Sequence, residues 1–176
     1  MISYELSLGL ALIGVLMVAG SLRLNDVVAS QADYTLLGFL PRWNVFTQPL
    51  GFLLFTVSAF AETNRLPFDL PESEQELVAG YHAEYSSMKF SMFFMAEYAS
   101  MITAAAVIAT LFFGGWHVPW VIDSADTSLL ASLLKVAAFA AKTAFFLFLF
   151  LWVRWTLPRL RYDQVMWRSE ERRVGK

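Results

Sequence analysis

The chain has 176 residues, of which 57% are hydrophobic and 16% are charged, and its formal net charge is −2. Soluble domains carry about 25% charged and about 45–50% apolar residues, so both an ordinary soluble globule and a disordered chain are disfavoured. The charge balance provides no basic surface for nucleic acid, and the lack of Cys excludes disulfides, zinc–thiolate sites and iron–sulfur clusters ligated by this chain.

Four apolar stretches of the sequence are long enough to cross a bilayer, whose hydrocarbon core of about 30 Å requires about 20 helical residues. They cover residues 6–22, 45–61, 90–113 and 129–153. A soluble bundle with buried helices is the alternative, but Phe145–Val153 is apolar on every side of a helix. The sequence therefore predicts an all-α fold, a polytopic transmembrane helix bundle.

The Lys and Arg residues outside these stretches predict the orientation, because cytoplasmic loops carry an excess of both. Four spans place the two ends of the chain and the loop 63–88 on one side of the membrane. The other side has only Arg23 and Arg42, in two outer loops, 23–44 and 114–128, that show little periodicity. Both termini are therefore expected to be cytoplasmic. The cations on that side, before the last few residues of the chain, are Arg65, Lys89, Arg154, Arg159, Arg161 and Arg168.

The segment from Glu62 to Glu97, which includes the cytoplasmic loop, holds seven of the 15 acidic residues. For Glu72, Glu74 and Glu76, which follow Pro71, a solvated acidic helix is as good an interpretation as a functional one. Glu97 differs, because it lies inside a predicted span, where an ionisable group normally faces protein or water and marks a path for protons or ions. The acids in this part are Glu62, Asp69, Glu72, Glu74, Glu76, Glu84 and Glu97.

Two lysines interrupt the last predicted span and share one face of its helix. Lys135 is near enough to the outer end for its side chain to reach the interface. Lys142 is deeper, so we expect it to have a buried carboxylate partner or a water-filled path, at a depth similar to that of Glu97. Glu5, at the inner end of the first span, is either an interfacial charge or a functional one. These residues alone leave a carrier, a channel and a redox-coupled pump open.

The loop sequence AETNRLPFDLPE (residues 61–72), continuing into EQELVAGYH (residues 74–82), narrows this choice. It closely resembles the signature loop of the complex I subunit 1 family, which includes the corresponding membrane subunit of bacterial proton-translocating NADH:quinone oxidoreductase. The order and spacing agree from Met1 to about Met166. Further matching segments are MISYE (1–5), QPLGF (48–52), FMAEY (94–98), WVR (152–154) and PRLRYDQ (158–164).

The resemblance implies a membrane subunit of a quinone-reducing enzyme complex, with no complete active site in this chain and no cofactor bound by it. It implies quinone as the substrate of the complex, other complex I subunits as partners, and the bacterial inner membrane as the location. The quinone-chamber loop would include Arg65, Phe68 and Asp69. The proton or charge relay would comprise Glu5, Glu62, Asp69, Glu72, Glu74, Glu76, Glu84, Glu97 and Lys142.

Family members have more helices than the four predicted here, so the sequence is expected to be an internal membrane-domain fragment, 1–166, with a non-matching tail, 167–176. Two alternatives remain from the sequence. One is the homologous membrane subunit of a hydrogenase-type complex or another with a different electron donor. The other, less favoured, is a free-standing channel or carrier, which would predict internal inverted repeats.

Overall fold

The computed structural model describes residues 2–32, 35–36, 40–63, 88–118 and 128–158, and these are almost entirely helical. This agrees with the predicted all-α membrane bundle. Two strands of two residues each, β1 and β2, pair in antiparallel fashion. The elements are α1 (Ile2–Ala19), α2 (Leu24–Ala32), β1 (Thr35–Leu36), β2 (Leu40–Pro41), α3 (Asn44–Thr47), α4 (Pro49–Glu62), α6 (Met88–Phe112) and α7 (Leu129–Thr156).

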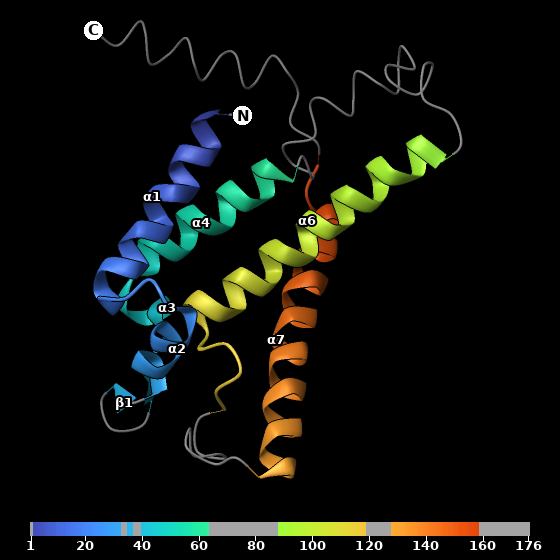
Figure 1. The fold of residues 1–176 in the computed structure, drawn as a ribbon. Coiled ribbons are helices and arrows are strands. Elements are labelled where there is room, and N and C mark those ends of the chain that lie inside the picture. Colours follow the sequence, from blue (N-terminus) through green and yellow to red (C-terminus); the bar gives the residue numbers. More distant parts are fainter. Residues whose placement is uncertain (1, 33–34, 37–39, 64–87, 119–127, 159–176) are drawn as a thin grey trace, which may run out of the picture.

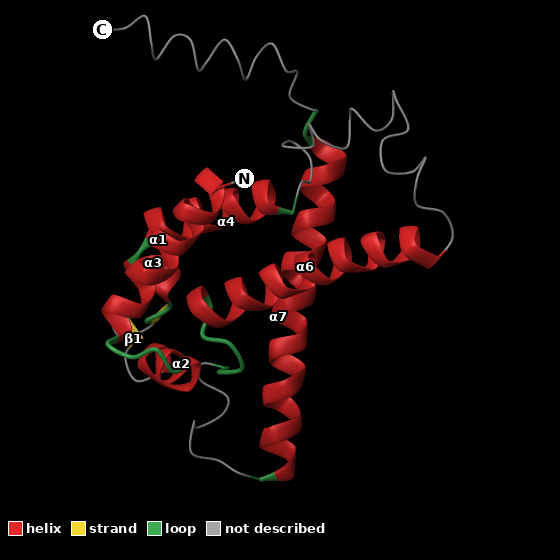
Figure 2. Cartoon of the chain, turned by 45° about the horizontal axis from the view of Figure 1, so that its top comes forward, coloured by secondary structure: helices red, strands yellow, loops and turns green. Residues whose placement is uncertain are grey.

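The helices form two packed pairs, α1 with α4 and α6 with α7. In Figure 1 the start of α1, the end of α4, the start of α6 and the end of α7 all lie toward the top of the view. The segments around α2 and α3, and the turn that follows α6, lie at the opposite end. Figure 2 shows that α6 crosses α7 steeply rather than running beside it. This up-and-down order is the one that alternating spans require.

Two of the four predicted spans, α6 and α7, are long and apolar enough to cross a membrane by length and composition. The first predicted span, 6–22, corresponds to α1, which passes the same test only together with the following α2, and the two helices are bent by 61°. The remaining one, α4, is a shorter apolar helix of 14 residues. The predicted span begins at residue 45, but Gln48 has φ −135° and ψ 63°, which separates α3 from α4, and Pro49 then occupies the first helical position.

The outer loop 23–44 was predicted to be irregular, and this is wrong for its first half, which forms α2. Gly20 ends α1 in the left-handed conformation at φ 68°, and its amide donates to the Leu16 carbonyl over 2.9 Å. The chain then turns and buries Val27 and Val28 of α2 completely or almost so. The short helix was missed because its apolar residues cover only one narrow face, between Asn, Asp and Ser.

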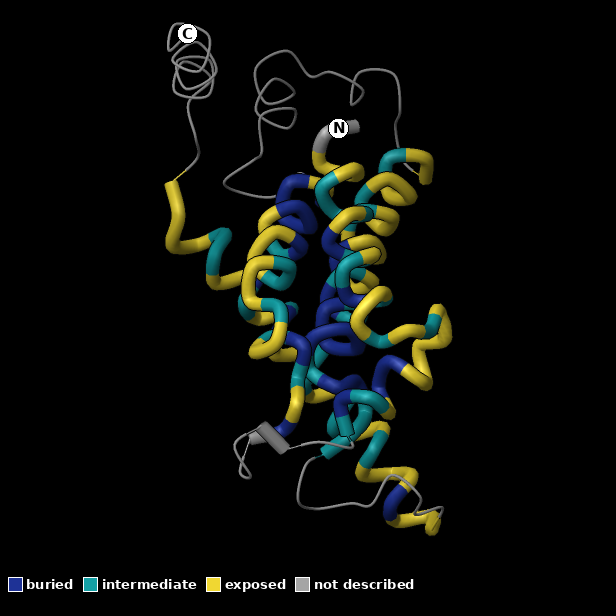
Figure 3. Tube along the Cα trace, turned by 90° about the vertical axis from the view of Figure 1, so that its left-hand side faces the viewer, coloured by how far each residue is buried: buried dark blue, intermediate teal, exposed yellow. Residues whose placement is uncertain are grey.

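Aromatic side chains hold the helices together where they meet. Phe112 of α6 packs against Phe52 and Phe55 of α4, with ring centroids 5.4 and 5.7 Å apart. Phe60 of α4 packs on Phe150 of α7 at 4.2 Å. Figure 3 shows the buried residues gathered where the helices face each other and the exposed ones on the outside. The outer faces are rich in large apolar side chains, as expected of helices that contact lipid or further helices.

Candidate functional site

A mainly apolar cavity of about 480 Å³ lies between α1, α4 and α6. Its walls are Leu and Phe side chains and small Ala residues, and its polar lining groups come from two helices. Near the end of α4 the polar residues are Glu62 and Thr63, and on α6 they are Ser100 and Thr103. We call this space the helix cavity. Ligand sites in proteins have about this size and this mixture of apolar walls with a few polar groups.

Three predicted relay acids lie on the three helices that form the helix cavity, one on each helix. Glu62 lines it directly as the last residue of α4. Glu5 is one turn before the lining residue Leu8 on α1, and Glu97 is one turn before Ser100 on α6, because residues three apart share a helix face. Glu5 and Glu62 are exposed, whereas Glu97 is half-buried. We call this side of the cavity the acidic end.

The helices leave room at the acidic end because they are tied together further along. Phe55, fully buried, is at once a wall of the helix cavity and a packing partner of Phe112. At the start of α4, the side-chain amide of Gln48 donates to the Gly14 carbonyl of α1 over 3.0 Å, and this bond links α1 to α4. The small residues Gly14 and Gly51 both lie next to this side chain.

The remaining predicted loop residues lie outside the described part of the chain. This applies to the quinone-chamber residues Arg65, Phe68 and Asp69, and to the loop acids of the predicted relay. The described residues on either side of this segment are the end of α4 at Glu62 and the start of α6 at Met88. Both lie toward the top of Figure 1, as the acidic end does. The loop acids concerned are Asp69, Glu72, Glu74, Glu76 and Glu84.

Lys142 does not share a depth with Glu97, contrary to the sequence-based expectation. Its ammonium group contacts residues that follow the C-terminal end of α6, and Phe113 is about 24 Å from Glu97 along the helix axis at about 1.5 Å per residue. The ammonium donates to the carbonyls of Phe113, Gly115 and His117 over 2.8, 2.9 and 2.8 Å. Among the described residues, no carboxylate bonds to it.

Two amide side chains that sequence reasoning missed complete this arrangement. Gln31 of α2 and Asn44 of α3 are almost fully buried. The Gln31 amide donates to the carbonyls of Thr110 and Leu111 over 3.4 and 3.2 Å, and that of Asn44 to Leu111 over 2.8 Å. The Gln31 side-chain oxygen in turn accepts from the Asn44 main-chain amide at 3.3 Å. We call Gln31, Asn44 and Lys142 together the polar cap of α6.

The polar cap meets a need that every helix end has, because the last carbonyls of a helix have no amide partner in the next turn. The chain leaves α6 through Gly114 and Gly115, at φ 69° and 51°, a conformation that glycine adopts without cost. This double turn directs three carbonyls toward Lys142. The sequence does contain a signal, the Gly-Gly pair at the end of an apolar helix, but this pair does not identify Gln31, Asn44 or Lys142 as the partners of the carbonyls.

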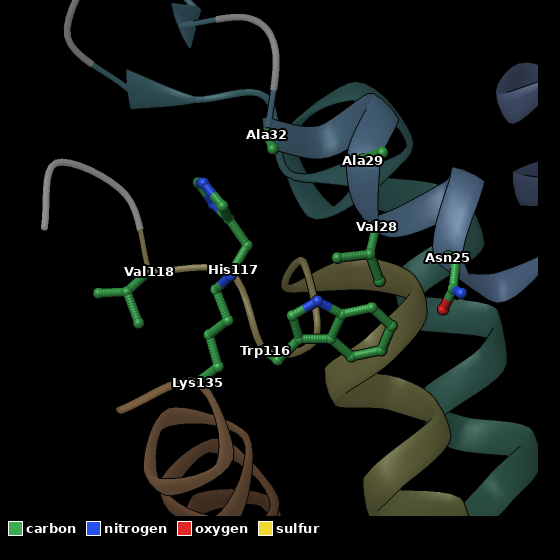
Figure 4. Close-up of a pocket in the computed structure, with 8 residues that line it drawn as sticks. All are labelled: Asn25, Val28, Ala29, Ala32, Trp116, His117, Val118 and Lys135. Atoms are coloured by element: carbon green, nitrogen blue, oxygen red, sulfur yellow. The ribbon is translucent and has the colours of Figure 1, made fainter. Parts of the chain in front are cut away.

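A second, smaller cavity of about 200 Å³ lies beside the polar cap, between α2, the turn after α6 and the start of α7. Figure 4 shows that the side chains of Trp116, His117 and Lys135 reach it from the turn and from α7, opposite Asn25 and Val28 of α2. The carbonyl of His117 bonds to Lys142, so its backbone is fixed on one side while its ring lines this cavity.

Comparison with known proteins gives a consistent result over nearly the whole chain. The family model described as NADH dehydrogenase matches residues 1–170. A Rhodothermus marinus protein named NADH-quinone oxidoreductase subunit 8 is 54% identical over 173 residues, which cover 94% of this chain and 50% of that protein.

Two further relatives are also named as subunits of NADH-quinone oxidoreductase. The protein from Salinibacter ruber is 51% identical over 94% of this chain and 49% of its own length. The one from Deinococcus deserti is 52% identical over 94% of this chain and 40% of its own length. The chain therefore spans about half the length of the curated relatives it matches.

Proposed function

The chain belongs to the NADH dehydrogenase family, and from this premise we propose that it is part of the membrane subunit of a respiratory NADH:quinone oxidoreductase. In that complex it helps to form the quinone chamber and couples quinone reduction to proton translocation. The observation that supports this best is the position of the helix cavity, an apolar space lined by Glu62, with Glu5 and Glu97 one helical turn from residues that line it.

The chemistry of quinone reduction matches such a site. A quinone that becomes a quinol takes up two electrons and two protons, and its long apolar tail needs a dry path from the bilayer. An apolar cavity between membrane helices suits the tail, whereas carboxyl groups at its end can supply and pass on protons. The proposal gives this chain the proton part of the reaction, and other subunits of the complex, its partners, deliver the electrons.

The proposed proton route begins at the loop that carries Arg65, Phe68 and Asp69, beside the quinone head group. It continues through the carboxylates of the acidic end to Glu97, inside α6. Lys142 lies at the other end of α6 from Glu97, so we leave it out of this route. The acids of the route are Glu5, Glu62, Asp69, Glu72, Glu74, Glu76, Glu84 and Glu97.

The proposed location is the inner membrane of a bacterial cell, with the acidic end on the cytoplasmic side. The excess of Lys and Arg at this end supports this orientation. It places the loop 64–87 where a peripheral, NADH-oxidising arm would dock.

Glu97→Gln tests the proposed route in the full-length subunit within its complex, in membrane vesicles. The amide keeps the size and much of the hydrogen bonding of the carboxyl but cannot titrate. We expect NADH:quinone activity and proton pumping to fall by about tenfold, equal to about 1.4 kcal/mol in the barrier. Oxidation of NADH by a hydrophilic artificial acceptor should be unchanged, because it bypasses this subunit.

Thr56→Val is the matched control, since Thr56 does not line the helix cavity and its hydroxyl bonds to the Phe52 carbonyl of its own helix. This variant should reduce quinone at the wild-type rate. If Glu97→Gln pumps protons at the wild-type rate and stoichiometry, Glu97 is structural and the proposed route is wrong at that step.

A further inference from the structure

The Lys142 ammonium sits in a cage of main-chain oxygens at the end of α6. Three carbonyls accept its three N–H donors at 2.8–2.9 Å, and the ring of Trp43 lies with its centroid 5.6 Å from the nitrogen. Carbonyls can only accept hydrogen bonds, and an aromatic face attracts cations. A neutral amine has only two N–H donors, so it would leave one carbonyl unsatisfied. The cage therefore fits the charged form of Lys142.

The position of the cage adds a second reason for a fixed positive charge. The C-terminal end of a helix carries the negative end of the helix dipole, and a cation there is stabilising. The neighbouring carbonyls of Thr110 and Leu111 are bonded by neutral amides, Gln31 and Asn44, so Lys142 supplies the only charge of the polar cap. It also joins α7 to the backbone directly after α6 through three hydrogen bonds.

We propose that Lys142 is a positioning residue that stays protonated. Its charge closes the C-terminal end of α6, clamps α7 to it, and thereby fixes the axial position of α6 and of Glu97 on it. This role differs from that of a relay group, which must lose and regain its proton in each cycle. The pumping part of the test rests on the proposed function, whereas hydrogen exchange does not.

Lys142→Arg separates the two roles, because a guanidinium is a cation that does not deprotonate in proteins and stacks well on an aromatic ring such as Trp43. The variant is made in the full-length subunit within its complex. Positioning predicts that it assembles, pumps protons within about twofold of wild type, and keeps slow amide exchange in the segment 109–118. An assembled Lys142→Arg complex with slow exchange but no pumping would show that Lys142 has to titrate, and the proposal would be wrong.

Lys142→Ala gives an independent result and does not depend on the fit of the larger arginine. Without the ammonium, amide exchange in 109–118 should become about tenfold faster, the change expected for losing about 1.4 kcal/mol of charged hydrogen bonding. Added propylammonium or K⁺, neither of which is tied to α7, should bind the carbonyls and slow the exchange again.

Thr143→Val is the matched control, because Thr143 is the next residue and its hydroxyl bonds to the Phe139 carbonyl within α7. Exchange in 109–118 should then stay at the wild-type rate. If Lys142→Ala leaves this exchange unchanged, Lys142 does not close the end of α6 and the proposal fails, whatever happens to pumping. Failure of the proposed function would instead appear as normal pumping in Glu97→Gln, with the exchange results at Lys142 unaffected.

Discussion

Polar side chains have opposite environments at the two ends of α6. Toward the acidic end, Glu97 lies one turn from a cavity of about 480 Å³, and Glu5 and Glu62 are exposed. At the other end, Gln31 and Asn44 are buried and, with Lys142, their donors are used by carbonyls of α6 and the following turn. A carboxyl group near an open cavity can exchange protons. A side chain whose N–H donors are all used in hydrogen bonds can only keep the bonded segments in place. The same helix is therefore anchored by hydrogen bonds at one end and lies beside an open cavity toward the other.

Gln31→Leu should have the largest effect on stability, because it removes buried hydrogen bonds at the C-terminal end of α6. It removes a donor from the Thr110 carbonyl and the acceptor of the Asn44 main-chain amide, whereas the Leu111 carbonyl keeps the side-chain amide of Asn44. Each buried group left unsatisfied costs about 1–3 kcal/mol. Thermal unfolding of the purified complex in detergent should show a clear loss, with quinone reduction per assembled complex unchanged.

Ser30→Ala is the control for this change, since Ser30 is adjacent but its hydroxyl bonds to Val27 within α2. It should shift the unfolding temperature little. Equal effects of the two variants would show that the amide contacts of Gln31 do not stabilise the end of α6.

Gly115→Ala should have a smaller effect at the same end. A Cβ there would lie 3.0 Å from Cγ2 of Val28, and alanine is strained at φ 51°. The cost expected from left-handed backbone is about 1–2 kcal/mol, before any repacking of Val28. Gly9→Ala, where a Cβ meets nothing within 4 Å, should not destabilise α1. If both variants unfold at the wild-type temperature, the turn after α6 is not held as tightly as its contacts indicate.

Arg65→Ala tests the acidic end, because Arg65 is the one cation of a strongly acidic loop segment. We expect quinone reduction to slow by about tenfold, equal to about 1.4 kcal/mol in the barrier, through loss of the charge beside the quinone head group. The complex should assemble with an unchanged unfolding temperature. Normal quinone kinetics in an assembled Arg65→Ala complex would remove Arg65 from the proposed chamber.

Ser73→Cys should have the smallest energetic effect and decides the orientation of the two ends. A membrane-impermeant thiol reagent should label it from the cytoplasmic side of the membrane only. The unchanged chain has no Cys and should not be labelled, so it is the negative control. Labelling from the periplasmic side alone would reverse the proposed topology.

Sequence reasoning identified the apolar helices and the family because both depend on local information. The apolar runs of α6 and α7 are visible residue by residue, and the loop sequence from Ala61 to His82 is specific in its order. The bend between α1 and α2 was not predicted, because Gly20 signals an end but not the direction that the chain takes afterwards. Nor was the break at Gln48, because a polar residue before Pro49 fits the opening of one continuous span equally well.

The partners of Lys142 could not be predicted from the sequence for a different reason. A buried lysine needs an acceptor, and the expected acceptor was a carboxylate, because acids are visible in a sequence. Main-chain carbonyls are present at every residue, and which of them lack an amide partner depends on where α6 ends. Only the three-dimensional structure shows that Gly114 and Gly115 turn those carbonyls toward α7.

The short length of α4 has a consequence for the membrane itself. Its 14 residues rise by about 21 Å, whereas the hydrocarbon core is about 30 Å thick. With Gln48 at one boundary, Glu62 would lie about 9 Å inside the other, and a bilayer responds to such a hydrophobic mismatch by thinning locally. Water and lipid head groups would then dip toward Glu62, so that the route for a proton from bulk solvent is shortened by the deformation of the lipid rather than by any side chain.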